Sequence, residues 1–94
     1  MKTVMVNELN DNFCGESIQM KGWVYNTRSI GKIWFLIFRD GTGLIQGVIV
    51  KNEASEETFG LESKLNQEDS IIIEGIIRKE NRSIGGFEIG IKNI

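Results

Sequence analysis

An aromatic ring and a side-chain amide form the first candidate site in this sequence. Segments 33–39 and 44–50 are rich in β-branched and aromatic residues, a pattern typical of β-strands. Because side chains alternate across a strand, Phe35 shares a face with Arg39, whose guanidinium needs water. We expect Phe35 and Gln46 on one outward face. There the ring can stack on a planar ligand while the amide hydrogen-bonds to the ligand's edge.

The connection between these strands is predicted to be a tight turn. Residues 40–43 read Asp-Gly-Thr-Gly, and Gly41 and Gly43 can take the positive φ that a sharp reversal requires. No helix follows the glycines, so they form a turn and not a phosphate-binding loop. Arg39 and Asp40 are expected to act as a structural ion pair or a turn cap. The segment therefore reads as a β-hairpin.

The composition points to binding and not to catalysis. The chain has no histidine and a single cysteine, Cys14, which excludes a zinc site, a Cys-His pair and a Ser-His pair within these residues. We assign no catalytic and no metal-binding residue. Cys14 cannot form an internal disulfide and is expected to be a small buried hydrophobe. Trp23 and Trp34 are predicted to be core residues, and Trp34 shares its face with Leu36 and Phe38.

The charge is unevenly distributed along the chain. The net charge is −2, yet residues 17–39 hold four cations and no acid, whereas residues 51–74 hold seven acids against two cations. The local electric field of a cationic segment matters more for binding a polyanion than the net charge of the chain does. The alternative is that these charges simply lie on solvent-exposed faces without a partner. No apolar run approaches the roughly 20 residues that span a bilayer, and the first 16 residues lack a signal peptide's apolar stretch. We expect a cytoplasmic protein without a membrane partner.

The elements that must position the candidate site are five strands and one helix. Ser55 suits a helix N-cap, with Glu56 and Glu57 in the first turn. Gly22 lies inside the first strand, where a glycine often marks a bulge or a sharp bend. A bulge there would change which face Arg28 occupies. The predicted strands cover residues 16–28, 33–39, 44–50, 70–79 and 87–94, the helix covers 55–65, and the first 14 residues form a lead-in.

This order of elements predicts an all-β fold with one short helix. The succession β-β-β-α-β-β fits a five-stranded Greek-key barrel of the OB type, as one domain over residues 1–94. The usual ligand surface of that fold lies on strands 2 and 3 and on the loops between strands 1–2 and 4–5. The face that holds Phe35 and Gln46 falls on this surface.

Two long runs of the chain resemble a known family. The runs GWVYNTRSIGKIWFLIFRDGTGLIQGVIVK and LNQEDSIIIEGIIRKENRSIGGFEI are similar to the N-terminal anticodon-binding domain of asparaginyl-tRNA synthetases. The resemblance covers nearly all of residues 15–94, and aspartyl- and lysyl-tRNA synthetases have related domains. The alternatives are the same domain from an aspartyl-tRNA synthetase, or a general OB module for single-stranded nucleic acid or for a protein.

The resemblance implies roles for four residues. Phe35 matches the aromatic residue that stacks on an anticodon base, and Gln46 matches the glutamine that reads the central uridine. Arg28 matches a basic residue that contacts the anticodon stem-loop, and Glu88 resembles the fifth-strand acid near the anticodon. The alternative is that neither Phe35 nor Gln46 binds a ligand: Phe35 would pack under a neighbouring element, and Gln46 would be an ordinary exposed polar residue.

General chemistry agrees with an RNA partner. Single-stranded RNA loops are read by stacking splayed bases on aromatic rings and by hydrogen bonds to base edges. Arg28, Lys32 and Arg82 could contact phosphates, which positions the loop without reading its sequence. We expect the 94 residues to bind a tRNA anticodon stem-loop without cofactor or catalysis. ATP and magnesium would serve a separate catalytic domain of a parent asparagine–tRNA ligase, which the resemblance implies is a homodimer.

Overall fold

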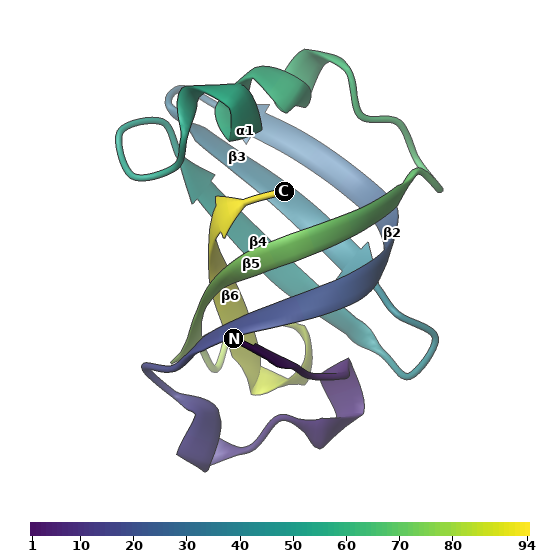
Figure 1. The fold of residues 1–94 in the computed structure, drawn as a ribbon, viewed down its shortest axis with the longest axis vertical. Helices are drawn as coiled ribbons and strands as arrows, with labels where there is room; N and C mark the ends of the chain where they lie inside the picture. The colour runs from purple at the N-terminus through teal and green to yellow at the C-terminus, as the bar shows by residue number, and fades with distance from the viewer.

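The strands of the chain close into a barrel (Figure 1). The computed structural model describes all residues, 1–94. The strand order is β1-β2-β3-β4-β6-β5, and pairing between β2 and β5 closes the sheet on itself. The predicted five-stranded barrel with one short helix is confirmed in β2 to β6. The strands are β1 (Lys2–Thr3), β2 (Ser17–Ile30), β3 (Ile33–Arg39), β4 (Leu44–Val50), β5 (Ser70–Lys79) and β6 (Phe87–Asn93).

The predicted hairpin is formed by β3 and β4. Phe35 is paired with Val48 across the two strands, and Ile37 is paired with Gln46. Asp40 caps the turn, because its Oδ1 accepts hydrogen bonds from the Thr42 amide at 2.9 Å and from the Thr42 hydroxyl at 2.7 Å. Of the two turn glycines only Gly41 has a positive φ, +90°. The turn-cap alternative for Asp40 is therefore the correct one.

The inward faces of the strands form a continuous apolar core. The alternation predicted for β3 is confirmed, since Trp34, Leu36 and Phe38 are fully buried. Trp23 contradicts its prediction, because 38% of it is exposed. Trp23 occupies one of the alternate positions of β2 whose side chains point outward. The Arg39 guanidinium carbon lies 5.5 Å from the centroid of the Trp23 ring. The core consists of Val4, Ile18, Met20, Val24, Trp34, Leu36, Phe38, Ile45, Ile49, Ile71, Ile73, Ile77, Ile89 and Ile91.

Strand β2 turns a corner of the barrel, and this settles where Arg28 lies. Its first half pairs with β5 and its second half with β3. Gly22 marks the corner, because a Cβ there would lie 2.2 Å from the Arg39 carbonyl oxygen. The bulge lies further along, where the register shifts between Val24 and Asn26. This shift reverses the parity of the strand and places Arg28 opposite Phe35, on the outward face.

The helix is shorter than predicted. Helix α1 covers Glu56–Gly60, and a 3-10 turn follows at Leu61–Ser63. The Ser55 N-cap is confirmed, since its hydroxyl accepts a hydrogen bond from the Thr58 amide at 3.1 Å. Gly60 ends the regular helix, in keeping with the low helix propensity of glycine. The helix lies across one end of the barrel, between β4 and β5 in the chain (Figure 1).

The lead-in is fastened to the opposite end of the barrel (Figure 1). Strand β1 pairs in parallel with β2, and 3-10 turns follow at Val6–Glu8 and Asp11–Phe13. The Val6 amide donates to Asp40 Oδ2 at 2.7 Å, which ties the lead-in to the hairpin turn. Cys14 is exposed and not buried, because it directly follows the second turn at the surface. A two-residue strand such as β1 has too little sequence to be predicted.

Candidate nucleic-acid interface

Five of the six predicted residues share one polar hollow on the outside of the barrel. Arg28, Phe35 and Gln46 come from the successive strands β2, β3 and β4. All three line a cavity of about 250 Å³ and also an adjoining cavity of about 420 Å³. Glu88 and Arg82 line the second cavity as well. We call this pair of cavities the strand hollow.

Phe35 provides the flat surface of the hollow. Its side chain lies on the outward face of β3, between the buried Trp34 and Leu36, and it is half-buried. The guanidinium carbon of Arg28 lies 5.3 Å from the ring centroid, a cation–π arrangement. The prediction that Phe35 faces outward is confirmed. Its ring and the neighbouring cation form a surface on which a base could stack close to a positive charge.

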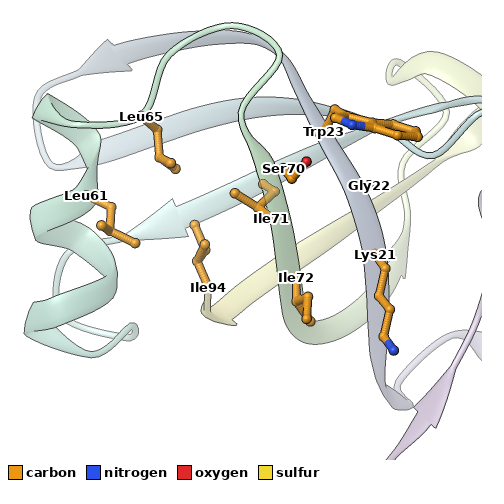
Figure 2. A pocket seen from close by; sticks show the side chains of 9 residues that line it. All are labelled: Lys21, Gly22, Trp23, Leu61, Leu65, Ser70, Ile71, Ile72 and Ile94. Atoms are coloured by element: carbon orange, nitrogen blue, oxygen red, sulfur yellow. The ribbon is translucent and has the colours of Figure 1, made fainter.

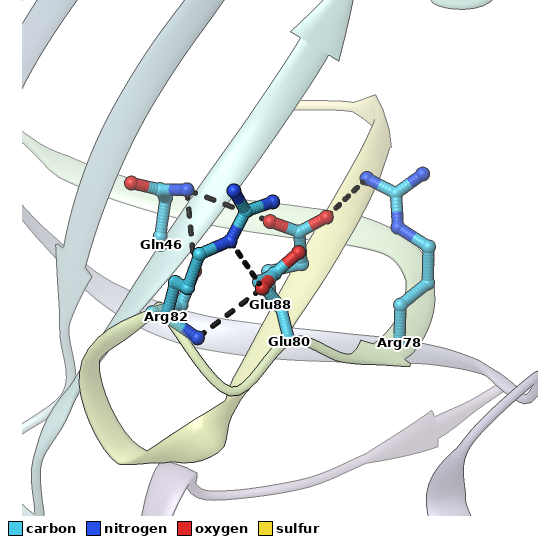
Figure 3. Close-up of polar contacts among 6 residues, drawn as sticks. Gln46, Arg78, Glu80, Arg82 and Glu88 are labelled. Atoms are coloured by element: carbon cyan, nitrogen blue, oxygen red, sulfur yellow. Dashed lines mark hydrogen bonds and ion pairs between the residues drawn. The ribbon is translucent and has the colours of Figure 1, made fainter.

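Gln46 provides the hydrogen-bonding group beside that ring. Its Nε2 lies 3.4 Å from the Ser83 hydroxyl oxygen and 3.5 Å from Glu88 Oε2 (Figure 3). Both contacts are at the long end of the hydrogen-bond range, so the amide is not consumed by a short bond. Oε1 has no partner among the hydrogen bonds of the chain. The amide can therefore offer both a donor and an acceptor to a ligand.

The β5–β6 loop contributes a charged pair to the rim of the hollow. Glu80 Oε1 accepts from the Arg82 side-chain Nε at 3.2 Å and from the Arg82 amide at 3.2 Å. The hydrogen bonds from Arg82 lower the pKa of Glu80, and they raise the pKa of Arg82 in turn. The Arg82 side chain is 91% exposed, so its guanidinium stays accessible to a phosphate.

One predicted residue lies apart from the others. Lys32 is exposed in the β2–β3 turn and lines neither cavity of the strand hollow. Two residues that contact the predicted site residues were not predicted from the sequence. Ser83 faces Gln46, and Arg78 forms an ion pair with Glu88 at 2.9 Å. The outward parity of Arg78 was visible in the sequence, but its partner depends on the pairing of β5 with β6.

The largest cavity lies elsewhere and has a different character. It measures about 800 Å³ and lies between β2, β5 and the segment that follows α1 (Figure 2). Its walls are mainly aliphatic, and we call it the apolar groove. The residues that line it are Lys21, Gly22, Trp23, Leu61, Leu65, Ser70, Ile71, Ile72 and Ile94. It offers few donors or acceptors to the edge of a base.

Two further observations bear on the kind of site. No group of three or more His, Cys, Asp or Glu side chains is placed to hold a metal ion. No helix is long and apolar enough to span a membrane.

Comparison with known proteins identifies relatives of the whole chain. It is 47% identical over its 94 residues to an asparagine–tRNA ligase of Pelotomaculum thermopropionicum, of which it covers 22%. It is 37% identical over the same length to the asparagine–tRNA ligase of Pyrococcus horikoshii, again covering 22%. The chain thus spans about a fifth of the length of these relatives. The sequence resemblance to asparaginyl-tRNA synthetases is confirmed.

Solved structures agree with this relationship. Asparaginyl-tRNA synthetase from Pyrococcus horikoshii, complexed with asparaginyl-adenylate, superposes with a TM-score of 0.89 at 38% identity, covering 99% of this chain and 21% of that one. Aspartyl-tRNA synthetase from Entamoeba histolytica superposes with a TM-score of 0.83 at 22% identity, covering 99% and 20%, which shows the shared fold alone. Residues 18–94 match the tRNA anticodon family, described as an OB-fold nucleic acid binding domain. With its closed barrel and its polar strand hollow, this chain belongs to that family of OB-fold nucleic acid binding domains.

Proposed function

We propose that this chain is the anticodon-binding domain of an asparagine–tRNA ligase and that it reads the central U of the anticodon. The proposal rests on one observation above all, that Phe35 and Gln46 line the same hollow on neighbouring strands. Identities of 37% to 53% with asparagine–tRNA ligases support the asparagine enzyme.

The recognition chemistry divides between stacking and hydrogen bonding. A base splayed from the anticodon loop stacks on the Phe35 ring, which contributes on the order of 1–3 kcal/mol. The Gln46 amide accepts from N3–H of uridine and donates to its O4. The hydrogen bonds select the base, whereas stacking adds affinity for any base, and the RNA backbone needs separate contacts.

Cations around the strand hollow are proposed to hold the RNA backbone. Arg28 lies beside Phe35, and Arg82 projects from the β5–β6 loop. Lys32 lies outside the hollow, so it would meet a phosphate further along the stem-loop. Phosphate contacts fix position and register but do not read sequence.

The activity of the parent enzyme is a separate part of the proposal. A ligase of this family would join asparagine to its tRNA with ATP and magnesium outside these 94 residues, as a cytoplasmic homodimer. We expect no amino-acid activation by the 94 residues alone. Asparagine-dependent pyrophosphate exchange by the purified chain would contradict this expectation.

The test is a titration of two RNA hairpins that differ only in the central base of the anticodon. At one fixed salt concentration, the central-U hairpin should bind roughly 10-fold more tightly than the central-C hairpin, as for a good bidentate contact. Gln46→Ala should remove most of this difference while leaving the stacking contribution in place. Superimposable curves for the two hairpins with the wild-type chain would refute the proposal.

A further inference from the structure

A row of three side chains crosses neighbouring strands beside the proposed base site. Gln46 on β4 is paired with Glu88 on β6, and Glu88 is paired with Arg78 on β5 (Figure 3). Arg78 NH2 lies 2.9 Å from Glu88 Oε1, and Gln46 Nε2 lies 3.5 Å from Glu88 Oε2. The carboxylate therefore lies between a cation and an amide, with one oxygen toward each.

The carboxylate determines which way the amide faces. The two ends of a glutamine amide have nearly the same shape, so its orientation depends on its partners. A carboxylate only accepts hydrogen bonds, so even at 3.5 Å it favours the orientation in which the NH2 group of Gln46 faces Glu88. Turning the amide over would bring Oε1 against a carboxylate oxygen, which places two acceptors in contact. Ser83 imposes no such constraint, because a hydroxyl both donates and accepts.

Glu88 is itself held in position. Its side chain is only 15% exposed, and its ion pair with Arg78 orients the carboxylate. The Arg78 guanidinium lies over the backbone of Gly90, where an added Cβ would be 3.4 Å from Arg78 Cζ. A Cβ at this position would make only ordinary van der Waals contact with the guanidinium, so Arg78 packs closely against position 90. The row is thus anchored at the end remote from Gln46.

A fixed amide distinguishes bases that a free amide cannot. Uridine presents N3–H as a donor and O4 as an acceptor, whereas cytidine presents N3 as an acceptor and its 4-amino group as a donor. A freely rotating glutamine satisfies either base by turning over. We infer that Glu88, anchored by Arg78, is a positioning residue that locks the Gln46 amide and thereby makes the site specific for uridine. The inference rests on the proposed function.

The direct test replaces the carboxylate with an amide. Glu88→Gln keeps the size of the side chain but can donate as well as accept, so Gln46 becomes free to turn over. The wild-type preference for central U over central C, roughly 10-fold, should fall to about threefold or less, mainly through tighter binding of the central-C hairpin. Arg78→Ala should reduce the preference by a smaller factor, because Glu88 loses its anchor but keeps its charge.

A neighbouring acid supplies the matched control. Glu80→Gln removes one charge from the same hollow, but Glu80 contacts Arg82 and not Gln46. It should change the affinity for both hairpins together and leave their ratio unchanged. A ratio that changes equally in Glu80→Gln and Glu88→Gln would mean that charge alone is responsible, and the lock would be overturned.

The remaining outcomes separate the lock from the proposed function. If the wild type prefers central U and folded Glu88→Gln retains the full preference, the lock is wrong and the proposed function stands. If Glu88→Gln alters the preference only at a flanking base, Glu88 reads that base itself, which also overturns the lock. A wild-type chain without any preference overturns both. In the free protein, side-chain amide NMR should show a more mobile Gln46 amide in Glu88→Gln.

Discussion

The apolar groove is larger than the strand hollow, but the strand hollow has the more polar lining. The groove has the larger volume, about 800 Å³, but its walls are mainly aliphatic. The hollow consists of cavities of about 250 and 420 Å³, yet it brings together an aromatic ring, an amide and charges of both signs. We therefore place the proposed recognition site by its convergent donors and acceptors beside a stacking surface, and not by volume.

The two regions also differ in what their residues do for the fold. Ile71 lines the groove but belongs to the buried core. Phe35 and Gln46 lie on outward positions whose neighbours along the strand fill the core instead. Substitutions in the groove should therefore affect stability, and substitutions in the hollow should affect binding. This separation can be tested from its largest effect to its smallest.

The largest effect is expected from Ile71→Ala in the wall of the groove. Removing a buried isoleucine side chain should lower the free energy of unfolding by about 2–5 kcal/mol. Denaturant titration measures this loss, and Ile72→Ala, at a position 47% exposed, is the matched control with a much smaller expected loss. Hairpin affinity should not change at temperatures where the variant is folded. Weaker binding by the folded variant would make the groove part of the RNA site.

Phe35→Ala should produce the opposite result. Loss of the stacking surface should weaken hairpin binding by about 1–3 kcal/mol, nearly independently of salt because stacking releases few counterions. The melting temperature should stay close to that of the wild type. Parallel melting curves and titrations at several salt concentrations provide the measurement. A collapsed melting temperature would show that the ring supports the core.

Arg28→Ala should affect binding through charge. If the guanidinium meets a phosphate, its removal should weaken binding and flatten the salt dependence of affinity by about one phosphate contact. Arg28→Lys is the control, since it keeps the charge and should keep the salt dependence. The Arg28→Ala slope should be compared with that of Phe35→Ala, which we expect to remain unchanged. An unaltered slope for Arg28→Ala would remove this residue from the phosphate contacts.

The smallest effect concerns the charged pair on the rim of the hollow. Arg82 lowers the pKa of Glu80 below its ordinary value of 4.5. The stabilisation of the β5–β6 loop by this pair is therefore present above that value and is lost as the pH falls through the lowered pKa. An NMR titration should give a lower midpoint for the Glu80 carboxyl in the wild type than in Arg82→Ala. Equal midpoints would mean that the pair does not persist in solution.

Local patterns were sufficient for most of the barrel. The bounds predicted for β3, β4 and β5 agree with the structure, because alternation and turn glycines are features of adjacent residues. The outward placement of Phe35 and Gln46 followed from the same alternation. Helix α1 was predicted too long, since its stripe of apolar residues continues into the 3-10 turn after Gly60.

Other features depend on contacts between distant segments. The face of the sheet on which Arg28 lies could not be found by counting alternate residues along β2. The bulge after Val24 reverses the alternation, and the position of this bulge was not indicated by Gly22. The partnership of Arg78 with Glu88 requires the register of β5 against β6. The exposure of Cys14 and the pairing of β1 depend on how the lead-in folds back. A single sequence does not show which distant segments pair or in which register.

The alternation of β3 also constrains how this part of the gene can change. Trp34 and Leu36 fill the core while Phe35 between them serves the outward face, so one strand supplies both roles at adjacent positions. Inserting or deleting one codon within β3 would exchange the two faces beyond that point and damage folding and recognition together. We expect this stretch to evolve by point substitution alone. Changes in length should be confined to the loops, such as residues 80–86.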